Sequence, residues 1–321
     1  MNRRWMLFAT AATAAALTAP LGAIAQDKTP LKIVVGFPPG GSADTLARLL
    51  ADGLRDRYSP VVVENRPGAG GRIALSQVKR AEPDGQTVIV LPSGPMVLFP
   101  HVYKKLDYDA VTDFTPISLL THFQFGVVAG PSSKAQNMGD MVAAAKAAPG
   151  RGSYGTPGQG TLPHFMGVLF EQQVGAKLNH VPFQGGGPAN AALVGGHVDY
   201  KFDVVSETAE LHRTGKVRIL AVTGAQRDPQ VPEVPTLKEA GVDMVATAWF
   251  GMYGPAGVPD AARDRLQQAV AEAMKQPALR ERLQGLGYEP VGSTPAELAA
   301  AQKADLARWA APIKATGISL D

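Results

Sequence analysis

Near its start the chain reads IVVGFPPGGSADTLARLL, in which the strand-like run 33–35 meets a loop of prolines and glycines, residues 37–44, that opens a helical pattern. Two later segments, 155–164 and 183–190, repeat this order of strand, glycines and helix start. Strands that alternate with helices of this length predict βαβ units and a parallel sheet. The three loops should therefore lie beyond the carboxyl ends of the strands, where open α/β sheets bind ligands.

Loops of this design predict an anion site built from backbone. The first amides of a helix have no partner within the helix, and its N-terminus carries about half a positive charge. Glycine lets a ligand approach that backbone, so no lysine or arginine is needed. Each loop alone also fits a tight turn with a helix cap, for which Ser42 and Asp44 are suitable residues. Three such loops shared between two lobes favour an anion cleft.

The same loops indicate which anion they bind. A phosphate-binding motif GxxxxGK(S/T) does not occur in the sequence. The pattern GxGxxG occurs at 150–155, but it follows a predicted helix and runs into a strand, whereas a dinucleotide fingerprint follows a strand and opens a helix. A carboxylate, which is smaller and carries less charge than a phosphate, suits bare amides.

The alternation of strands and helices restarts near residue 138, which predicts two α/β lobes. The chain is expected to cross between them near 121–125 and again near 246–251, so that lobe 1 is discontinuous. Helices at 261–275, 277–286 and 295–311 should wrap lobe 1, the last of them ended by Pro312. The expected division is a leader at 1–25, lobe 1 at 26–123 plus 250–321, and lobe 2 at 124–249.

The leader has the organisation of an export signal. A basic start containing Arg3 and Arg4 precedes an apolar, alanine-rich stretch, and Ala23-Ile24-Ala25 fits a cleavage site. We expect cleavage after Ala25; the arginine pair also fits the twin-arginine route. No later apolar run reaches the roughly 18 residues of a membrane-spanning helix.

Composition narrows the chemistry further. The net charge of +3 falls to about +1 without Arg3 and Arg4, so nothing attracts nucleic acid electrostatically. The chain has no cysteine, which excludes disulfides and a lipoprotein anchor, and its histidines show no metal-ligand spacing. Neither GxSxG nor HExxH occurs, so a catalytic nucleophile and a metalloprotease site are not indicated. We therefore expect a binding protein without catalytic residues, metal or cofactor.

Ten stretches, in order and covering the chain nearly from end to end beyond the leader, carry a family resemblance. They read IVVGFPPGGSADTLARLLA, VVVENRPGAGGRIA, AEPDGQTVIVLPSG, VYKKLDYDAVTDFTPIS, SYGTPGQGTLPHF, HVPFQGGGPANAALVGGHVDYKFD, GKVRILAVTG, VPTLKEAG, WFGMYGPAGVP and EPVGSTPAEL. By these the sequence resembles the Bug receptors, the periplasmic substrate-binding proteins of tripartite tricarboxylate transporters.

The resemblance implies a periplasmic binding protein, type II-like, with a cleft between two Rossmann-like lobes that close on a small carboxylate. Such a receptor acts in the periplasm, here expected as a monomer, and delivers its ligand to a membrane permease. Presentation of the ligand to a sensor kinase is the open alternative. A secreted enzyme acting on such acids, with Asp203 and His164 as a base pair, is the disfavoured one.

The resemblance also carries over ligand-binding residues. From lobe 1 they are Phe37, Gly40, Gly41, Ser42, Asp44, Ser93 and Gly94. From lobe 2 they are Gly155, Thr156, Gly158, Gly160, Thr161, His164, Gln184, Gly185, Gly186 and Asp203.

Three of these residues have equally simple structural roles. Asp203 can cap the turn that follows it, His164 can lie behind the ligand site or on the surface, and Phe37 can merely plug the cleft. The chain departs from the family at Asp203-Val204 and at 155–159, where it is less polar. Because lobe 2 reads the body of the ligand, this departure favours an apolar or aromatic carboxylate.

Overall fold

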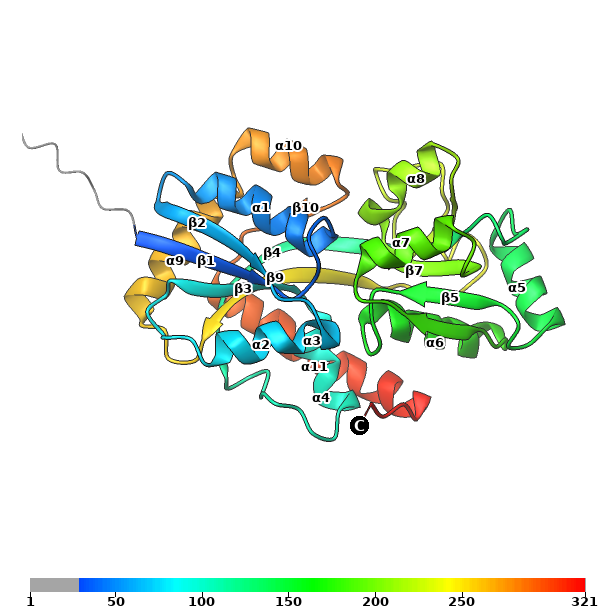
Figure 1. Cartoon of the computed structure of the whole chain (residues 1–321), viewed down its shortest axis with the longest axis horizontal. Helices are drawn as coiled ribbons and strands as arrows, with labels where there is room; N and C mark the ends of the chain where they lie inside the picture. Colours follow the sequence, from blue (N-terminus) through cyan, green and yellow to red (C-terminus); the bar gives the residue numbers. More distant parts are fainter. Residues whose placement is uncertain (1–28, 321) are drawn as a thin grey trace, which may run out of the picture.

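The computed structural model describes residues 29–320, so the expected leader and its cleavage site lie outside the described part of the chain. These residues form one sheet of ten strands with the path β2-β1-β3-β9-β4-β7-β5-β6, and β8 and β10 also pair with β4. Helices cover this sheet in two lobes that lie side by side, as Figure 1 shows. The α/β fold expected from the alternating pattern is therefore confirmed.

Lobe 1 is built on three parallel strands. Val35 of β1 lies beside Asn65 of β2 and Val90 of β3, while β9 and β4 continue the sheet in antiparallel pairing. Leucines of α1 that recur every three or four residues, among them Leu46 and Leu50, are buried against this sheet. The elements are β1 (Thr29–Val35), α1 (Ser42–Leu54), β2 (Tyr58–Asn65), α2 (Arg72–Lys79), β3 (Thr87–Pro92), α3 (Gly94–Val97) and α4 (Phe99–Val102).

Lobe 2 repeats the plan on a smaller scale. Its strands β7, β5 and β6 are parallel to one another, and β7 and β8 both run antiparallel to β4. The elements are α5 (Met138–Ala147), β5 (Ser153–Thr156), α6 (Leu162–Val174), β6 (Asn179–Pro182), α7 (Gly186–Val194), β7 (Tyr200–Val204), the 3₁₀ turn η2 (Val205–Glu207), α8 (Ala209–Arg213) and β8 (Arg218–Val222).

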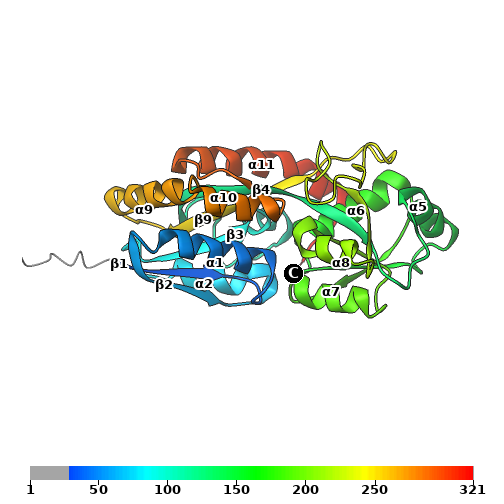
Figure 2. The ribbon, with the colours of Figure 1, turned by 90° about the horizontal axis from the view of Figure 1, so that it is seen from above.

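Two long strands join the lobes. β4 (Phe114–Ala129) is a single strand of 16 residues that pairs with β9 (Thr247–Pro255) as far as Gln124 and with β7 from Phe125 onward. Figure 2 shows β4 and β9 running between the two helical layers. β4 stays continuous through residues 121–124, where the chain was expected to cross between the lobes, because these residues also pair with β9.

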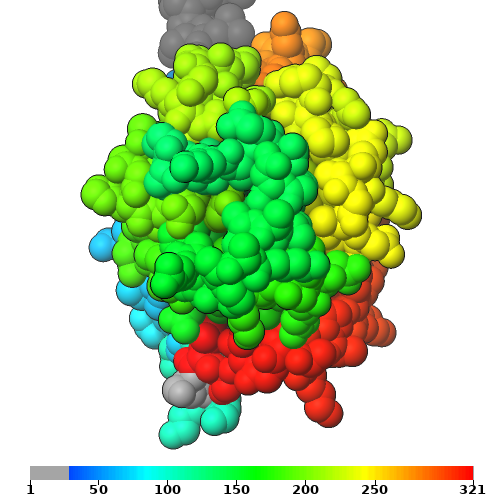
Figure 3. Space-filling view, turned by 90° about the vertical axis from the view of Figure 1, so that its right-hand side faces the viewer, coloured from blue at the N-terminus to red at the C-terminus, as the bar shows by residue number. Residues whose placement is uncertain are grey.

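The C-terminal helices are α9 (Asp260–Ala273), α10 (Pro277–Gly285) and α11 (Pro295–Thr316), with the short strand β10 (Glu289–Pro290) between the last two. The expectation that Pro312 ends the last helix was wrong. The helix continues for another turn, because the buried Ile313 anchors that turn and Gly317 then caps it with φ of 66°. α11 also packs against α6, and Figure 3 shows this segment directly beneath the outer face of lobe 2.

Within the described residues no helix combines the length and apolarity needed to cross a membrane.

Candidate ligand-binding site

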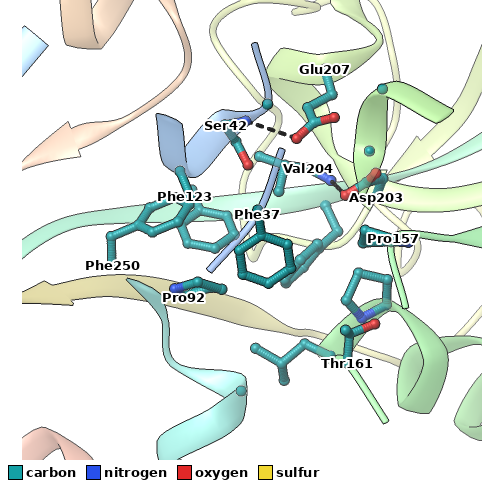
Figure 4. A pocket seen from close by; sticks show the side chains of 18 of the residues that line it. Phe37, Ser42, Pro92, Phe123, Pro157, Thr161, Asp203, Val204, Glu207 and Phe250 are labelled. Atoms are coloured by element: carbon teal, nitrogen blue, oxygen red, sulfur yellow. Dashed lines mark hydrogen bonds between the residues drawn. The ribbon is translucent and has the colours of Figure 1, made fainter. Parts of the chain in front are cut away.

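A cavity lies between the lobes, where the ends of their parallel strands face each other (Figure 4). It encloses about 650 Å³ of empty space, part of it open to solvent. Loops after β1, β3, β5, β6 and β7 form its walls together with side chains of β4 and β9. The lining residues are Phe37, Pro38, Pro39, Gly41, Ser42, Ala43, Pro92, Gly94, Pro95, Phe123, Phe125, Pro157, Thr161, Leu162, Pro163, Gly186, Gly187, Asp203, Val204, Glu207 and Phe250.

The middle of the cavity is aromatic. Phe123 and Phe250 stack with ring centroids 4.5 Å apart, and Phe123 meets Phe125 edge-on at 5.3 Å. Phe37, which is only half-buried, projects between these rings and the lobe 2 residues (Figure 4). Because the two buried rings are fixed by the strands that join the lobes, the cavity offers a rigid apolar surface.

The loop that precedes α1 is held in shape from within lobe 1. Gly40 has φ of 83°, a conformation that favours glycine, and its amide donates to Asp44 Oδ2 at 2.9 Å. Arg48 Nε donates to the same oxygen at 2.9 Å, and Asn65 Nδ2 donates to Asp44 Oδ1 at 2.9 Å. Burial alone would raise the pKa of Asp44, but these hydrogen bonds outweigh burial and lower it. Asp44 therefore shapes the loop that leads into α1, and the first amides of that helix belong to Ser42 and Ala43, which line the cavity.

One of those amides already binds a carboxylate. Ser42 N donates to Glu207 Oε1 at 2.9 Å, a hydrogen bond that joins the two lobes and is drawn in Figure 4. Glu207 ends η2, the turn that follows β7. The other carboxylate oxygen lies against Gly186, the first residue of α7, so closely that a Cβ on that glycine would come within 1.6 Å of Glu207 Oε2. Two helix N-termini from opposite lobes thus converge on one carboxylate.

Behind this carboxylate lies a buried ion pair. Lys201 Nζ is 2.8 Å from Asp203 Oδ2, and the two side chains are 0% and 2% exposed. Lys201 Nζ also donates to Asn190 Oδ1 at 2.6 Å and to Gly186 O at 3.3 Å, which ties α7 to β7. Burial, with a smaller contribution from the Glu207 charge, raises the pKa of Asp203 to about 6 against the opposing effect of Lys201.

A pair of histidines lies behind the lobe 2 wall. The rings of His164 and His180 stack with centroids 3.9 Å apart. His164 Nδ1 accepts from Gly160 N at 3.1 Å, and His180 Nε2 lies 2.7 Å from Thr156 Oγ1. Burial lowers the pKa of His164 to about 4, and burial together with the neighbouring His164 lowers that of His180 to about 3. Both rings are therefore neutral near pH 7 and stabilise the segment from Thr156 to Gly160 that precedes α6.

The site can therefore accept an anion at backbone amides and an apolar group at the aromatic rings. Among residues 29–320 no three metal-binding side chains lie together.

Comparison with known proteins gives this site its context. The model of the tripartite tricarboxylate transporter family receptor matches residues 46–318. The chain belongs to this family. It is 32% identical over 309 residues to BugT of Bordetella pertussis, and the match covers 95% of each chain. The resemblance to the Bug receptors is confirmed, and the chain is a solute-binding receptor of that family.

Solved structures of receptors agree with the fold. MatC from Rhodopseudomonas palustris with bound malate is 32% identical, has a TM-score of 0.84, and is matched over 89% of this chain and 99% of its own. The R. palustris protein Rpa4515 with adipate is 31% identical, has a TM-score of 0.87, and is matched over 91% of this chain and 98% of its own. The two-lobed periplasmic binding protein fold is thereby confirmed.

Seven of the residues that the family resemblance suggested line the cavity. They are Phe37, Gly41, Ser42, Gly94, Thr161, Gly186 and Asp203.

The other ten do not line it in this structure, and most have a structural partner instead. Asp44 and His164 form the loop-shaping hydrogen bonds described above, Gly185 packs on Pro38, and Gln184 is exposed. Gly40 borders a neighbouring pocket. The remaining five are Ser93, Gly155, Thr156, Gly158 and Gly160, which are buried at the end of β5 and in the segments that follow β3 and β5.

Sequence reasoning missed Glu207, Lys201, Phe123 and Phe250. Lys201 lies two residues before Asp203 on the same strand, and alternation along that strand places both side chains on one face. The two phenylalanines lie within the segments where the chain was expected to cross between the lobes. Glu207 had no local signal, because its role depends on a contact with Ser42, 165 positions away.

Proposed function

We propose that this receptor binds a small organic carboxylate between its lobes in the periplasm and delivers it to the permease of a tripartite tricarboxylate transporter. The observation that carries the proposal is the N-terminus of α1. It opens into an apolar cavity, and one of its amides already holds a carboxylate oxygen. Malate and adipate, the ligands of the two related structures, are both carboxylates.

The carboxylate of the ligand binds at the first turn of α1. Burying a carboxylate costs several kcal/mol unless its oxygens are hydrogen-bonded. Ser42 and Ala43 line the cavity with the helix amides that have no partner within α1, and the N-terminal charge of the helix adds to their effect. Gly41 and Gly186 leave room for the ligand to come close to both backbones.

The body of the ligand packs on the rings. Phe37, Phe123 and Phe250 face the cavity from lobe 1, and Phe125 faces it from lobe 2. Each buried apolar Å² contributes about 25 cal/mol, so a ring or a short alkyl chain gains more here than a hydroxyl-rich body does. An apolar or aromatic carboxylate is therefore the class that this cavity fits best.

Two lobes close on the ligand, and β4 and β9 connect them. Lobe 1 comprises residues 26–123 and 250–321, and lobe 2 comprises residues 124–249. The receptor is exported by its leader, cleaved after Ala25, and acts as a monomer that returns its ligand unchanged. Closure is stabilised only by the difference in ligand affinity between the closed and the open forms.

A thermal-shift screen of residues 26–321 tests this proposal. The panel contains benzoate, nicotinate, adipate, malate, citrate and aspartate, together with benzamide and cyclohexanol as matched compounds without a carboxylate. A ligand at 100 times its Kd adds about 2.7 kcal/mol of stability, which raises the melting temperature measurably. We expect shifts with aromatic or aliphatic carboxylates and none with the uncharged compounds.

Shifts by uncharged compounds alone would contradict the carboxylate class. A preference for citrate or aspartate over the aromatic acids would contradict the apolar body. Mass spectrometry of the released ligand checks that it leaves unchanged, and a product of altered mass would show an enzyme.

A further inference from the structure

Glu207 occupies the position that a bound carboxylate needs. Its Oε1 accepts the amide of Ser42 at 2.9 Å, and this amide lies in the first turn of a helix of 13 residues. A single N–H has room for one good acceptor, so a ligand carboxylate and Glu207 cannot both bind Ser42 N at this distance. The chain therefore carries its own competitor at the anion site of lobe 1.

The competitor is placed from the opposite lobe. η2 presents Glu207 from the end of β7, and the carboxylate lies against Gly186 at the start of α7. The neighbouring Ser206 lies with its Oγ 3.2 Å from the hydroxyl of Tyr288, which belongs to the C-terminal part of lobe 1. These two contacts hold the lobes together at one edge of the cavity.

A displaced Glu207 side chain has a polar place to go. Glu207 and Ser42 also border a second pocket, which adjoins the cavity and contains about 460 Å³ of empty space, part of it open to solvent. The residues that line it include Thr45, Asn190, Ser206 and Tyr288. Hydroxyl groups can hydrogen-bond a carboxylate that has left Ser42 N, and Asn190 Nδ2 already donates to the backbone carbonyl of Glu207 at 2.7 Å. Glu207 thus lies between the apolar cavity and the more polar second pocket.

We propose that Glu207 is a specificity-determining residue: an internal carboxylate that holds the anion site of α1 until a ligand carboxylate displaces it, and that selects against ligands with a second carboxylate. This inference rests on the proposed function, because it requires that the ligand carboxylate binds at α1.

The selection follows from charge. After displacement, Glu207 remains attached beside the cavity and keeps its negative charge within a few Å of the ligand. One ligand carboxylate is compensated by the amides of α1, whereas a second one meets Glu207 with no Lys or Arg among the described residues that line the cavity. The buried Lys201 behind this wall is already paired with Asp203. Monocarboxylates with an apolar body should therefore bind more tightly than dicarboxylates.

The test is titration calorimetry of the 26–321 chain with benzoate, adipate and malate. Wild type is compared with Glu207→Ala, with Glu207→Gln and with the matched control Glu210→Gln. Glu210 is exposed, lies three residues further along the chain, pairs with Arg213 and lines neither pocket, so its variant removes the same charge from the same lobe. Melting curves first confirm that each variant is folded, and Glu207→Gln preserves the size of the side chain if Glu207→Ala is unstable.

We expect Glu207→Ala to bind benzoate at least 5-fold more tightly than wild type, and adipate and malate at least 20-fold more tightly. Glu207→Gln should gain less affinity than Glu207→Ala, because its amide oxygen still accepts from Ser42 N. Its gain should again be larger for adipate and malate than for benzoate, because the negative charge is gone. Glu210→Gln should stay within 2-fold of wild type.

Weaker binding of all three acids by both Glu207 variants would overturn the inference and make Glu207 a ligand contact. Gains no larger than those of Glu210→Gln would also overturn it, while the proposed function would stand. If no variant bound any carboxylate, both proposals would fall together. Binding by Glu207→Ala alone, with none by wild type, would support both.

Discussion

The two walls of the cavity handle charge in opposite ways. The lobe 1 residues that line it carry no titratable side chain, and this wall recognises ligands through helix amides, prolines and the rings of Phe37, Phe123 and Phe250. The lobe 2 wall brings two carboxylates to the cavity, Asp203 and Glu207, with the buried Lys201 behind them.

This difference follows from how each wall is built. The loop before α1 needs a charge too, but Asp44 is turned away from the cavity and neutralised by Arg48 at the surface. In lobe 2 the charged residues follow one another along β7 and η2, so the strand end itself delivers them to the cleft. Backbone amides cannot change their charge, whereas side chains can. Lobe 1 therefore provides a constant anion site and lobe 2 an adjustable one.

The largest expected effect is a loss of stability when the buried cation of lobe 2 is removed. Lys201→Met leaves Asp203 without its ion-pair partner, and loss of one member of a buried pair costs about 3–5 kcal/mol. The double variant Lys201→Met/Asp203→Asn should recover part of that loss. Urea unfolding measures the free energy of unfolding for each protein.

The matched change in lobe 1 is Arg48→Met. The Arg48 side chain is 52% exposed, and Asp44 keeps its hydrogen bonds from Gly40 and Asn65, so we expect a loss of about 1 kcal/mol or less. Equal losses for Arg48→Met and Lys201→Met would remove the contrast between the walls.

The next largest expected effect is a loss of carboxylate affinity when the anion site of lobe 1 is blocked. A Cβ on Gly41 would lie 3.5 Å from Glu207 Oε1, so the methyl groups of Gly41→Val project to where a carboxylate binds Ser42 N. We expect carboxylate affinity to fall at least 100-fold in titration calorimetry with benzoate. The backbone of Gly41 has φ of −80°, which valine adopts, so the melting temperature should change little.

Gly285→Val serves as the control, because the space around Gly285 is open and it lies in α10 away from the cavity. Unchanged benzoate affinity in Gly41→Val would exclude the α1 loop from the site.

A smaller effect tests the apolar face of lobe 1. Phe37→Ala removes a half-buried ring that projects into the cavity, and the lost contact of about 1–2 kcal/mol corresponds to roughly 10-fold weaker benzoate binding. Acetate, which has no ring to lose, should bind the variant and wild type alike. An equal loss for acetate would show that Phe37 positions the carboxylate site and does not contact the body of the ligand.

The smallest effect concerns pH and the histidine pair. The pKa values of His164 and His180 lie near 4 and 3 in the folded chain and near 6.5 when unfolded. Their stabilisation is therefore complete above pH 6.5 and is lost as the pH falls toward 4 and 3. Between pH 6.5 and 5.5 we expect a loss of about 1 kcal/mol for each histidine.

Urea unfolding at the two pH values, with His164→Asn and His180→Gln, should show a weaker pH dependence than wild type, whereas the exposed His197→Gln should match wild type. Hydrogen exchange should show that acid loosens α6 before α1. The opposite order would contradict the assignment of acid sensitivity to lobe 2.

The fold could be predicted from the sequence because its signals are local. The apolar period of α1 and the glycines before it specify a βα unit whatever the rest of the chain does. The end of the last helix was harder to predict from the sequence, because the turn after Pro312 depends on the burial of Ile313 against distant residues.

The site was only partly predictable for the same reason. Gly41, Ser42 and Gly186 lie at helix starts, which the sequence shows directly. The carboxylate of Glu207 that reaches Ser42 comes from the opposite lobe, and no spacing along the chain reveals a contact between residues 165 positions apart. His164 was expected near a ligand, but its partners are another ring and a backbone amide.

The position of β9 has a consequence for the time at which the protein can fold. This strand lies between β3 and β4 in the sheet, yet it comes from residues 247–255, after nearly all of lobe 2. During synthesis from the N-terminus, β1, β2, β3 and β4 are all made long before β9, the strand that joins β3 to β4. The sheet of lobe 1 cannot be completed until β9 arrives, and pairings over such long separations form slowly. Lobe 2, whose strands are nearly contiguous in sequence, can assemble first and wait for its partner.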